Sequence, residues 1–227
     1  MFSIVIPLFN EQRNIITLLD EINFSLKNFY NYEIIIIDDC SIDDTFKIVS
    51  KLTNKNLRLY KNNINRGQSF SIWRGIEKSS NEIIITIDGD GQNDPIDIMK
   101  LVKLYNTSTY GLVGGLRLKR KDNIIKRISS LFANYIRNLV LKDNCRDTGC
   151  SLKIFSKTIF MKMPYFDGIH RFLPALFKAY GCATTFIPVN HRHRKFGTSN
   201  YGTFDRAIRG IRDLIKVYFL IRKLKND

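Results

Sequence analysis

The chain has 227 residues, 44% of them hydrophobic, with 13 Gly and 5 Pro, so it can bury a core as one domain or as one domain with appendages. This composition excludes a disordered chain and a collagen-like repeat. Lys and Arg total 36 against 21 Asp and Glu, which gives a net charge of +15. The excess is uneven, because residues 1–110 carry 12 basic and 14 acidic side chains whereas residues 111–227 carry 24 and 7. A uniformly basic nucleic-acid coat would not divide in this way, and the basic half suggests an anionic partner, whether phosphates, lipid headgroups or nucleic acid.

Short apolar runs rich in β-formers alternate with helix-like stretches in the first half of the chain. They cover residues 3–8, 33–37, 57–60 and 82–87, the third being the weakest. Alternation of this kind predicts an α/β fold with a parallel sheet and crossover helices. The second half is less regular. It contains one amphipathic helical pattern over residues 124–139 and a final helix from about Thr203 to Leu224.

Membrane spans and disulfides are not expected from the sequence. The longest apolar run, residues 217–221, is far below the roughly 20 residues that cross a bilayer. The four cysteines form no C-x-x-C pair, and the N-terminus does not resemble a signal peptide. We therefore expect reduced thiols and a cytoplasmic protein.

Polar residues follow each long strand of the predicted sheet. Ligands of open α/β sheets collect at the carboxyl ends of the strands, so these residues mark the candidate site. The strongest candidate is the turn DGDGQ at residues 88–92, in which Asp88 and Asp90 can approach one hard cation and Gln92 can add an amide oxygen. Mg²⁺ or Mn²⁺ held in this way usually completes its shell with phosphate oxygens and water. Taken alone, the same turn also fits an acidic solvated loop.

Several further motifs recur in a definite order along the chain. In the first half they are SIVIPLFNE (3–11), IIDDCSIDDT (36–45), NRG (65–67) and DGDGQ (88–92). In the second half they are DTGCS (147–151), GIHRFLP (168–174) and HRHRKFGTSNYG (191–202). Their order and spacing resemble the family 2 glycosyltransferases, in the branch that acts on polyprenyl phosphates and includes dolichyl-phosphate mannose synthase. The resemblance implies a GT-A fold, a Rossmann-like and mainly parallel central sheet flanked by helices. It also implies a catalytic domain over residues 1–202, followed by an amphipathic, membrane-interfacial helix over 203–227.

The resemblance also implies roles for individual residues. The nucleotide diphospho-sugar donor would bind through Pro7, Phe9, Glu11, Asp38, Asp39 and Asp88. Asp88, Asp90 and Gln92 would hold Mg²⁺ or Mn²⁺ against the diphosphate, which makes Asp90 a catalytic residue. Arg117, Arg192 and Arg194 are candidate phosphate clamps, because they lie in predicted loops apart from any paired acidic residue, and Ser199 could add a hydroxyl donor.

The expected reaction is an inverting transfer of the sugar, in which a metal and arginines neutralise the departing diphosphate. A lipid phosphate acceptor needs no strong general base, since its second pKa is about 6. A glycan hydroxyl acceptor, the alternative, needs a carboxylate to take its proton, and Asp147 is the candidate for that base or for orienting the acceptor.

The terminal pattern predicts a helix that lies on an anionic membrane surface, with core packing as the other interpretation. We therefore expect a peripheral enzyme on the inner face of the cytoplasmic membrane, with a membrane-spanning partner subunit as a further possibility. A basic nucleic-acid-binding protein leaves the acidic motifs unexplained, so no nucleic-acid partner is expected. A catalytically inactive scaffold of the same fold is the remaining alternative.

Overall fold

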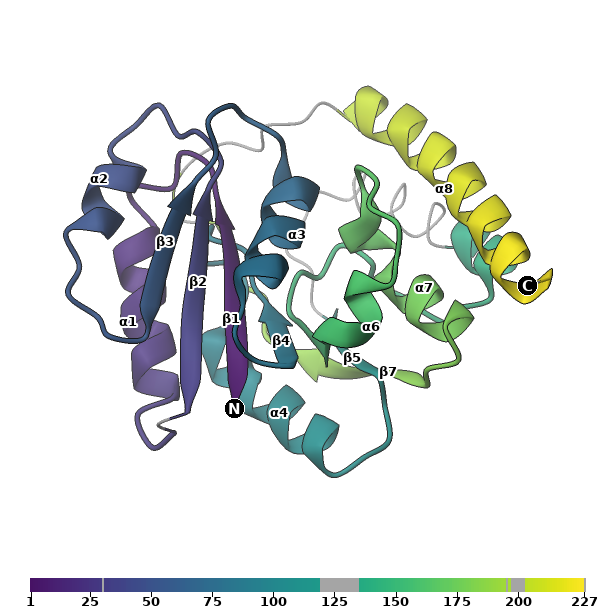
Figure 1. Ribbon diagram of the computed structural model, residues 1–227, viewed down its shortest axis with the longest axis horizontal. Coiled ribbons are helices and arrows are strands. Elements are labelled where there is room, and N and C mark those ends of the chain that lie inside the picture. Colours follow the sequence, from purple (N-terminus) through teal and green to yellow (C-terminus); the bar gives the residue numbers. More distant parts are fainter. Residues whose placement is uncertain (30, 119–134, 195, 197–202, 227) are drawn as a thin grey trace.

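The computed structural model describes residues 1–29, 31–118, 135–194, 196 and 203–226, with the backbone alone for 203–209 and 225–226. One seven-stranded sheet runs through the molecule, with helices on both faces (Figure 1). The strand order is β3-β2-β1-β4-β6-β5-β7. The strands are β1 (Phe2–Leu8), β2 (Tyr32–Asp38), β3 (Leu57–Lys61), β4 (Ile83–Thr86), β5 (Leu112–Arg117), β6 (Lys153–Ser156) and β7 (Thr184–Val189). The four strands predicted in the first half are confirmed to within a residue or two at each end.

Strand β6 is the one antiparallel member of the described sheet. It lies between β4 and β5 and runs against both, whereas β1 pairs in parallel with β2 and β4, and β5 with β7. The mainly parallel sheet expected from the sequence is confirmed. Because the other strands run the same way, their carboxyl ends meet at one edge, the upper edge for β1, β2 and β3 in Figure 1.

Two hydrophobic cores cover the two faces of the sheet. Alternate β1 residues point to opposite sides, so Ile4 and Ile6 join one core and Val5 the other. The first core receives α1 (Ile15–Ser25), α2 (Thr45–Ser50) and α4 (Ile98–Asn106), which follows the 3₁₀ turn η1 (Pro95–Asp97). The second receives α3 (Gln68–Lys78), α6 (Lys157–Met161), the 3₁₀ turn η2 (Ile169–Arg171), α7 (Leu173–Ala179) and part of α8 (Thr203–Asn226).

The final helix was expected over about 203–224 and is present as α8. Val217 is fully buried, and Leu214, Leu220 and Ile221 pack against the second core. The earlier helical pattern over 124–139 lies partly outside the described residues, but residues 135–141 are helical. No helix in the described part of the chain is both long and apolar enough to span a bilayer.

The contact between α3 and the sheet is close enough to require glycine. A Cβ built on Gly75 would lie 2.4 Å from Val5 Cγ1 and 3.3 Å from Ile37 Cγ1. This spacing lets α3 lie directly on β1 and β2, which fixes the start of the helix near the carboxyl edge of the sheet.

We predict that Gly75→Ala lowers the free energy of unfolding by about 1–3 kcal/mol, because the added methyl group overpacks the helix–sheet contact. The matched control is Gly210→Ala in α8, where a Cβ would meet nothing within 4 Å. That change should instead stabilise the protein by roughly 0.5–1 kcal/mol, since alanine favours the helix. Urea unfolding of both variants is the measurement, and equal stability of the two would contradict the close contact.

Candidate active site at the carboxyl edge of the sheet

The loops after β1 and β2 are joined at the carboxyl edge. The Asp39 backbone N–H donates to the Leu8 carbonyl at 2.7 Å. Asn10, at φ +56°, accepts a bond from the Ile42 N–H at 2.9 Å and donates its own N–H to the Ser41 hydroxyl at 3.0 Å. Asparagine tolerates this left-handed conformation better than most residues. The two loops therefore form one unit that carries the acidic residues expected around the nucleoside.

Asp38 and Asp39 have different surroundings. The Asp39 carboxylate accepts bonds from Asn62 Nδ2 at 2.6 Å and from the backbone N–H groups of Arg66 and Gly67 at 2.9 and 2.7 Å. Asp38 is fully buried, and its Oδ2 accepts a bond from the Ser41 N–H at 3.1 Å. Asp39 thus holds the loop that leads into α3. The expected contacts of both carboxylates with a nucleoside stay predictions.

The DGDGQ turn packs against the end of β1. A Cβ on Gly89 would lie 2.2 Å from Leu8 Cδ2 and 3.3 Å from the Pro7 carbonyl oxygen, so a larger residue would require the Leu8 side chain to shift. The Asp88 N–H donates to Ser151 Oγ at 3.1 Å, and the Gln92 N–H donates to Asp90 Oδ1 at 3.0 Å. These contacts place the turn between β1 and the segment before β6, with Pro7 and Phe9 half-buried at the neighbouring end of β1.

The two carboxylates of the turn lie close enough to influence each other. Burial, together with the negative charge of Asp90, raises the pKa of Asp88 from 3.8 to about 6. Two neighbouring carboxylates and an amide form a set of hard oxygen donors of the kind that Mg²⁺ and Mn²⁺ prefer. The residues therefore fit a divalent cation whose remaining ligands come from a diphosphate. The described residues contain no group of three or more His, Cys, Asp or Glu that could hold a metal alone.

Arg117, at the end of β5, forms a two-pronged ion pair with the buried Asp147. Its Nε donates to Oδ2 and its Nη2 to Oδ1, both at 2.7 Å, and its backbone N–H also donates to Oδ2 at 3.2 Å. Although burial disfavours the charged guanidinium, the hydrogen bonds and charge of Asp147 raise the pKa of Arg117. Nη1 lies 3.4 Å from His191 Nε2. Asp147, the candidate base, is thus held by Arg117, one of the candidate phosphate clamps.

Arg194 and Phe196 contact the β1–α1 loop. Arg194 pairs with the buried Glu11 and donates from Nε to the Phe196 carbonyl at 3.0 Å. Arg13 stacks on the Phe196 ring, with its guanidinium carbon 4.0 Å from the ring centroid. Burial raises the pKa of Glu11, although Asn14 and Arg194 act in the opposite direction.

The same segment is joined to the DGDGQ turn. The Arg192 N–H donates to the Gln92 carbonyl at 2.8 Å, and Gln92 Nε2 donates to the Arg192 carbonyl at 3.4 Å. The Arg192 side chain pairs with Glu21 Oε2 at 2.7 Å and Asp94 Oδ1 at 2.8 Å. Residues 191–194 and 196, the β1–α1 loop and the DGDGQ turn are therefore joined by direct contacts.

The idea that the three arginines lack acidic partners is wrong. Arg117 pairs with Asp147, Arg192 with Glu21 and Asp94, and Arg194 with Glu11. The partners are distant along the chain, and charge balance at a buried site favours such pairs. Ser199 lies outside the described residues. The other predicted site residues do gather at the carboxyl edge.

Several residues of this site were not predicted. Gln68, the first residue of α3, donates from Nε2 to Asp88 Oδ1 at 2.7 Å. Lys153, buried in β6, donates to the Cys150 carbonyl, and its charge acts to lower the pKa of Asp88. Gln68 directly follows the NRG motif after β3. The rule that ligands of α/β sheets collect at the carboxyl ends of the strands could therefore have found it. Lys153 lies within a strand, where that rule gives no signal.

We predict that Asp88→Asn stabilises the metal-free protein at alkaline pH. Ionisation of a carboxyl whose pKa is higher in the folded than in the unfolded state destabilises the fold, so this cost is nearly absent at about pH 3, grows as the pH rises past 3.8 and is complete above about pH 6. The gain should reach about 1–2 kcal/mol at about pH 8, below the roughly 3 kcal/mol of the full shift because the side chain is only half-buried. Urea unfolding in EDTA at about pH 3 and about pH 8 measures it, and an equal gain at the two would contradict the assignment.

The sequence model named Glycosyl transferase family 2 matches residues 3–164. Among curated proteins, the chain is 32% identical over 227 residues to dodecaprenyl-phosphate galacturonate synthase of Rhizobium johnstonii, covering 97% of this chain and 67% of that protein. It is also 32% identical over 217 residues to undecaprenyl-phosphate 4-deoxy-4-formamido-L-arabinose transferase of Yersinia pestis, covering 94% of this chain and 66% of that protein. The chain thus spans about two-thirds of the length of these relatives.

Solved structures of glucosyl-3-phosphoglycerate synthase from Mycobacterium tuberculosis share the fold. One, in complex with Mn²⁺, uridine diphosphate and phosphoglyceric acid, superposes with a TM-score of 0.72 at 18% identity, covering 97% of this chain and 78% of that chain. Another, in complex with Mg²⁺ and uridine diphosphate, gives 0.70 at 19% identity, covering 97% and 79%. The likeness establishes the GT-A fold. Together with the family match over most of its length, it shows that this chain belongs to the family 2 glycosyltransferases.

Proposed function

We propose that the protein transfers a sugar from a nucleotide diphospho-sugar to a polyprenyl phosphate, with inversion at the anomeric carbon. Family membership and the names of the two curated relatives support this proposal. The structural observation that supports it most is the ion pair between Arg117 and Asp147, because this pair favours a phosphate acceptor over a hydroxyl acceptor.

The donor would bind across the edge formed by β1, β2 and β4. Asp88, Asp90 and Gln92 would hold Mg²⁺ or Mn²⁺, and that cation would act as a Lewis acid on the departing diphosphate. The nucleoside would lie against Pro7, Phe9 and Glu11, with Asp38 and Asp39 supporting the loops around it. This arrangement is consistent with the raised pKa of Asp88, because a bound cation relieves the repulsion from Asp90.

The acceptor side favours a phosphate over a hydroxyl group. Asp147, the candidate base for a hydroxyl acceptor, accepts three hydrogen bonds from Arg117. An adjacent positive charge stabilises an ionised carboxylate and weakens it as a base. Asp147 is therefore better suited to orienting Arg117, whose guanidinium would contact an anionic acceptor. A lipid phosphate is itself a nucleophile near neutral pH, since its second pKa is about 6.

Substrate phosphates would compete with the internal carboxylates for Arg192 and Arg194. Both arginines are half-buried and ion-paired in the ligand-free protein. A doubly charged diphosphate or phosphate with several acceptor oxygens offers a stronger partner than one carboxylate. We propose that these arginines, with Ser199, contact substrate phosphates by exchanging or sharing their present partners.

The reaction would take place at the inner surface of the cytoplasmic membrane. On α8, Ile211, Ile215 and Phe219 recur every fourth residue and are 60%, 53% and 62% exposed. Arg212, Lys216 and Lys223 are exposed beside them, on the side of the helix away from Val217. We call Ile211, Ile215 and Phe219 the α8 stripe. Such a stripe with adjacent cations fits an anionic lipid interface, where an acceptor lipid also presents its phosphate.

The reaction itself is tested with a panel of UDP-, GDP- and CDP-sugars, a short polyprenyl phosphate and Mg²⁺ or Mn²⁺. We expect a glycosyl polyprenyl phosphate of inverted configuration with one donor, and no product in EDTA or with Asp90→Asn. Arg117→Lys keeps the charge but loses the two-pronged fork, so kcat/KM should fall more than about tenfold, or 1.4 kcal/mol. Transfer to a glycan hydroxyl, with none to the lipid phosphate, would reject the proposed acceptor.

The location is tested with vesicles that contain anionic lipid. Phe219→Ser should weaken binding about tenfold or more, because burial of a phenyl side chain in the interface contributes roughly 1.5–3 kcal/mol. Phe24→Ser is the matched control, since Phe24 is a 68% exposed phenylalanine on α1. The measurement is flotation of both variants and the wild type with these vesicles. An equal loss of vesicle binding in the two variants, or no loss in either, would show that the α8 stripe does not insert.

A further inference from the structure

Gln68 connects α3 to the candidate metal site. It is the first residue of the helix, it is half-buried, and its Nε2 lies 2.7 Å from Asp88 Oδ1. A bond to one carboxylate oxygen restricts rotation of the whole carboxylate group. The orientation of Asp88 therefore depends on a residue from a different element of the fold.

The first turn of α3 is held on two sides. On one side, the backbone N–H groups of Arg66 and Gly67 donate to Asp39. On the other, Ser69 Oγ accepts a bond from the Gly168 N–H at 2.7 Å and lies 2.8 Å from His170 Nδ1. Gln68 lies between these two anchors, so its amide is presented to Asp88 from a fixed backbone.

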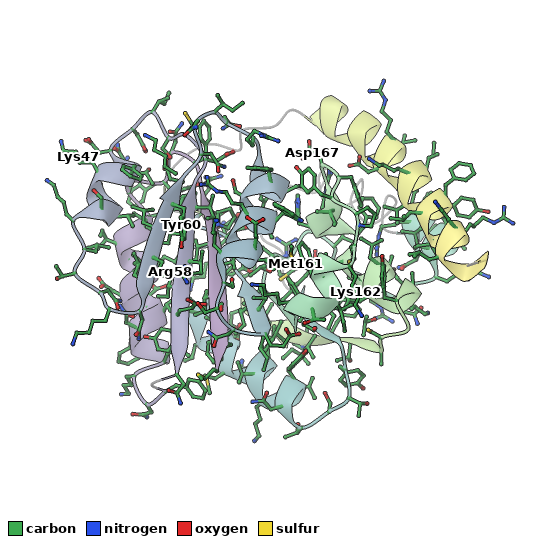
Figure 2. All side chains as sticks on the ribbon, viewed as in Figure 1. Lys47, Arg58, Tyr60, Met161, Lys162 and Asp167 are labelled. Atoms are coloured by element: carbon green, nitrogen blue, oxygen red, sulfur yellow. The ribbon has the colours of Figure 1, made fainter. Side chains whose placement is uncertain are left out.

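The His170 ring is neutral. Burial, with the nearby charges of Arg171 and Lys153, lowers the pKa of His170 to about 3, so the ring carries no charge at physiological pH. Ser69 Oγ and His170 Nδ1 share one hydrogen bond, whose donor depends on the tautomer of the ring, beside the bond that Ser69 accepts from Gly168. Asp167, three residues before His170 in the chain, lies between α3 and α8 in the view of Figure 2.

We propose that Gln68 is a positioning residue that holds the Asp88 carboxylate in the orientation needed to bind the divalent cation of the donor complex. Ser69 and His170 support it by fixing the first turn of α3. This inference rests on the metal-dependent donor site of the proposed function. Outer partners that orient a metal ligand typically change metal affinity 10–100-fold when they are removed. An amide suits this place, because it donates a hydrogen bond without adding a positive charge that would compete with the cation.

The test measures Mn²⁺ binding directly, by electron paramagnetic resonance titration of the full chain with UDP present. Gln68→Met keeps the length of the side chain but lacks the donor, and its dissociation constant for Mn²⁺ should rise tenfold or more. Gln68→Glu adds a second negative charge beside Asp88, so the spectrum of Mn²⁺ bound to this variant, and its affinity for Mn²⁺, should also differ from those of the wild type. Gln12→Met is the matched control, because Gln12 is an exposed glutamine at the same edge whose Oε1 accepts a bond from the Asp44 N–H at 2.9 Å.

A merely structural role would lower stability without changing the metal affinity of the folded fraction. We therefore expect Gln68→Met to reach most of the wild-type kcat at saturating Mn²⁺. The variant should differ from the wild type only in needing a higher Mn²⁺ concentration to reach it. If Asp90→Asn abolishes Mn²⁺ binding while Gln68→Met binds as the wild type does, the positioning role alone is overturned. If the wild type binds no Mn²⁺, both the metal site of the proposed function and this inference are overturned.

Discussion

The parallel sheet forces acidic side chains together. Because parallel strands end at one edge, the residues that follow β1, β2 and β4 meet there, and they include Glu11, Asp39 and Asp88. Several of these carboxylates are buried, and a buried charge is costly unless hydrogen bonds or opposite charges compensate it. The surrounding loops supply that compensation, through backbone N–H groups at Asp39, an amide at Asp88 and arginines elsewhere.

The uneven charge of the chain has a structural explanation in these contacts. Arg117, Arg192 and Arg194 all come from the basic second half, and two of them reach carboxylates that belong to the first half. The second half thus folds its cations over the acidic edge that the first half creates. The candidate site therefore contains matched internal ion pairs, with each of the three arginines next to at least one carboxylate.

The sequence predicted the four strands of the first half, their parallel arrangement and the edge at which the candidate site lies, since all three follow from local patterns. It did not predict β5, β6 and β7 or the antiparallel place of β6 in the sheet. It did not predict the partners of the arginines, because Glu11 and Arg194 are 183 residues apart and no local rule joins them. Gln68 differs from these arginines, because it follows the end of β3, where a local rule could have found it, although its contact with Asp88 also needs α3 to lie close to β1 at Gly75. The α8 helix was given two competing interpretations, and the structure supports packing on one face while the other stays exposed.

The two faces of α8 have a consequence for how the protein behaves during purification. Val217 and its neighbours hold the helix on the second core, and Asp213 is joined to Arg171 of η2 at 2.9 Å. The helix therefore does not need a lipid surface to keep its place, and the α8 stripe stays exposed in plain buffer. Exposed apolar surface of this kind promotes association between copies. Reversible, concentration-dependent oligomers that a mild detergent disperses are thus an expected property of the isolated chain.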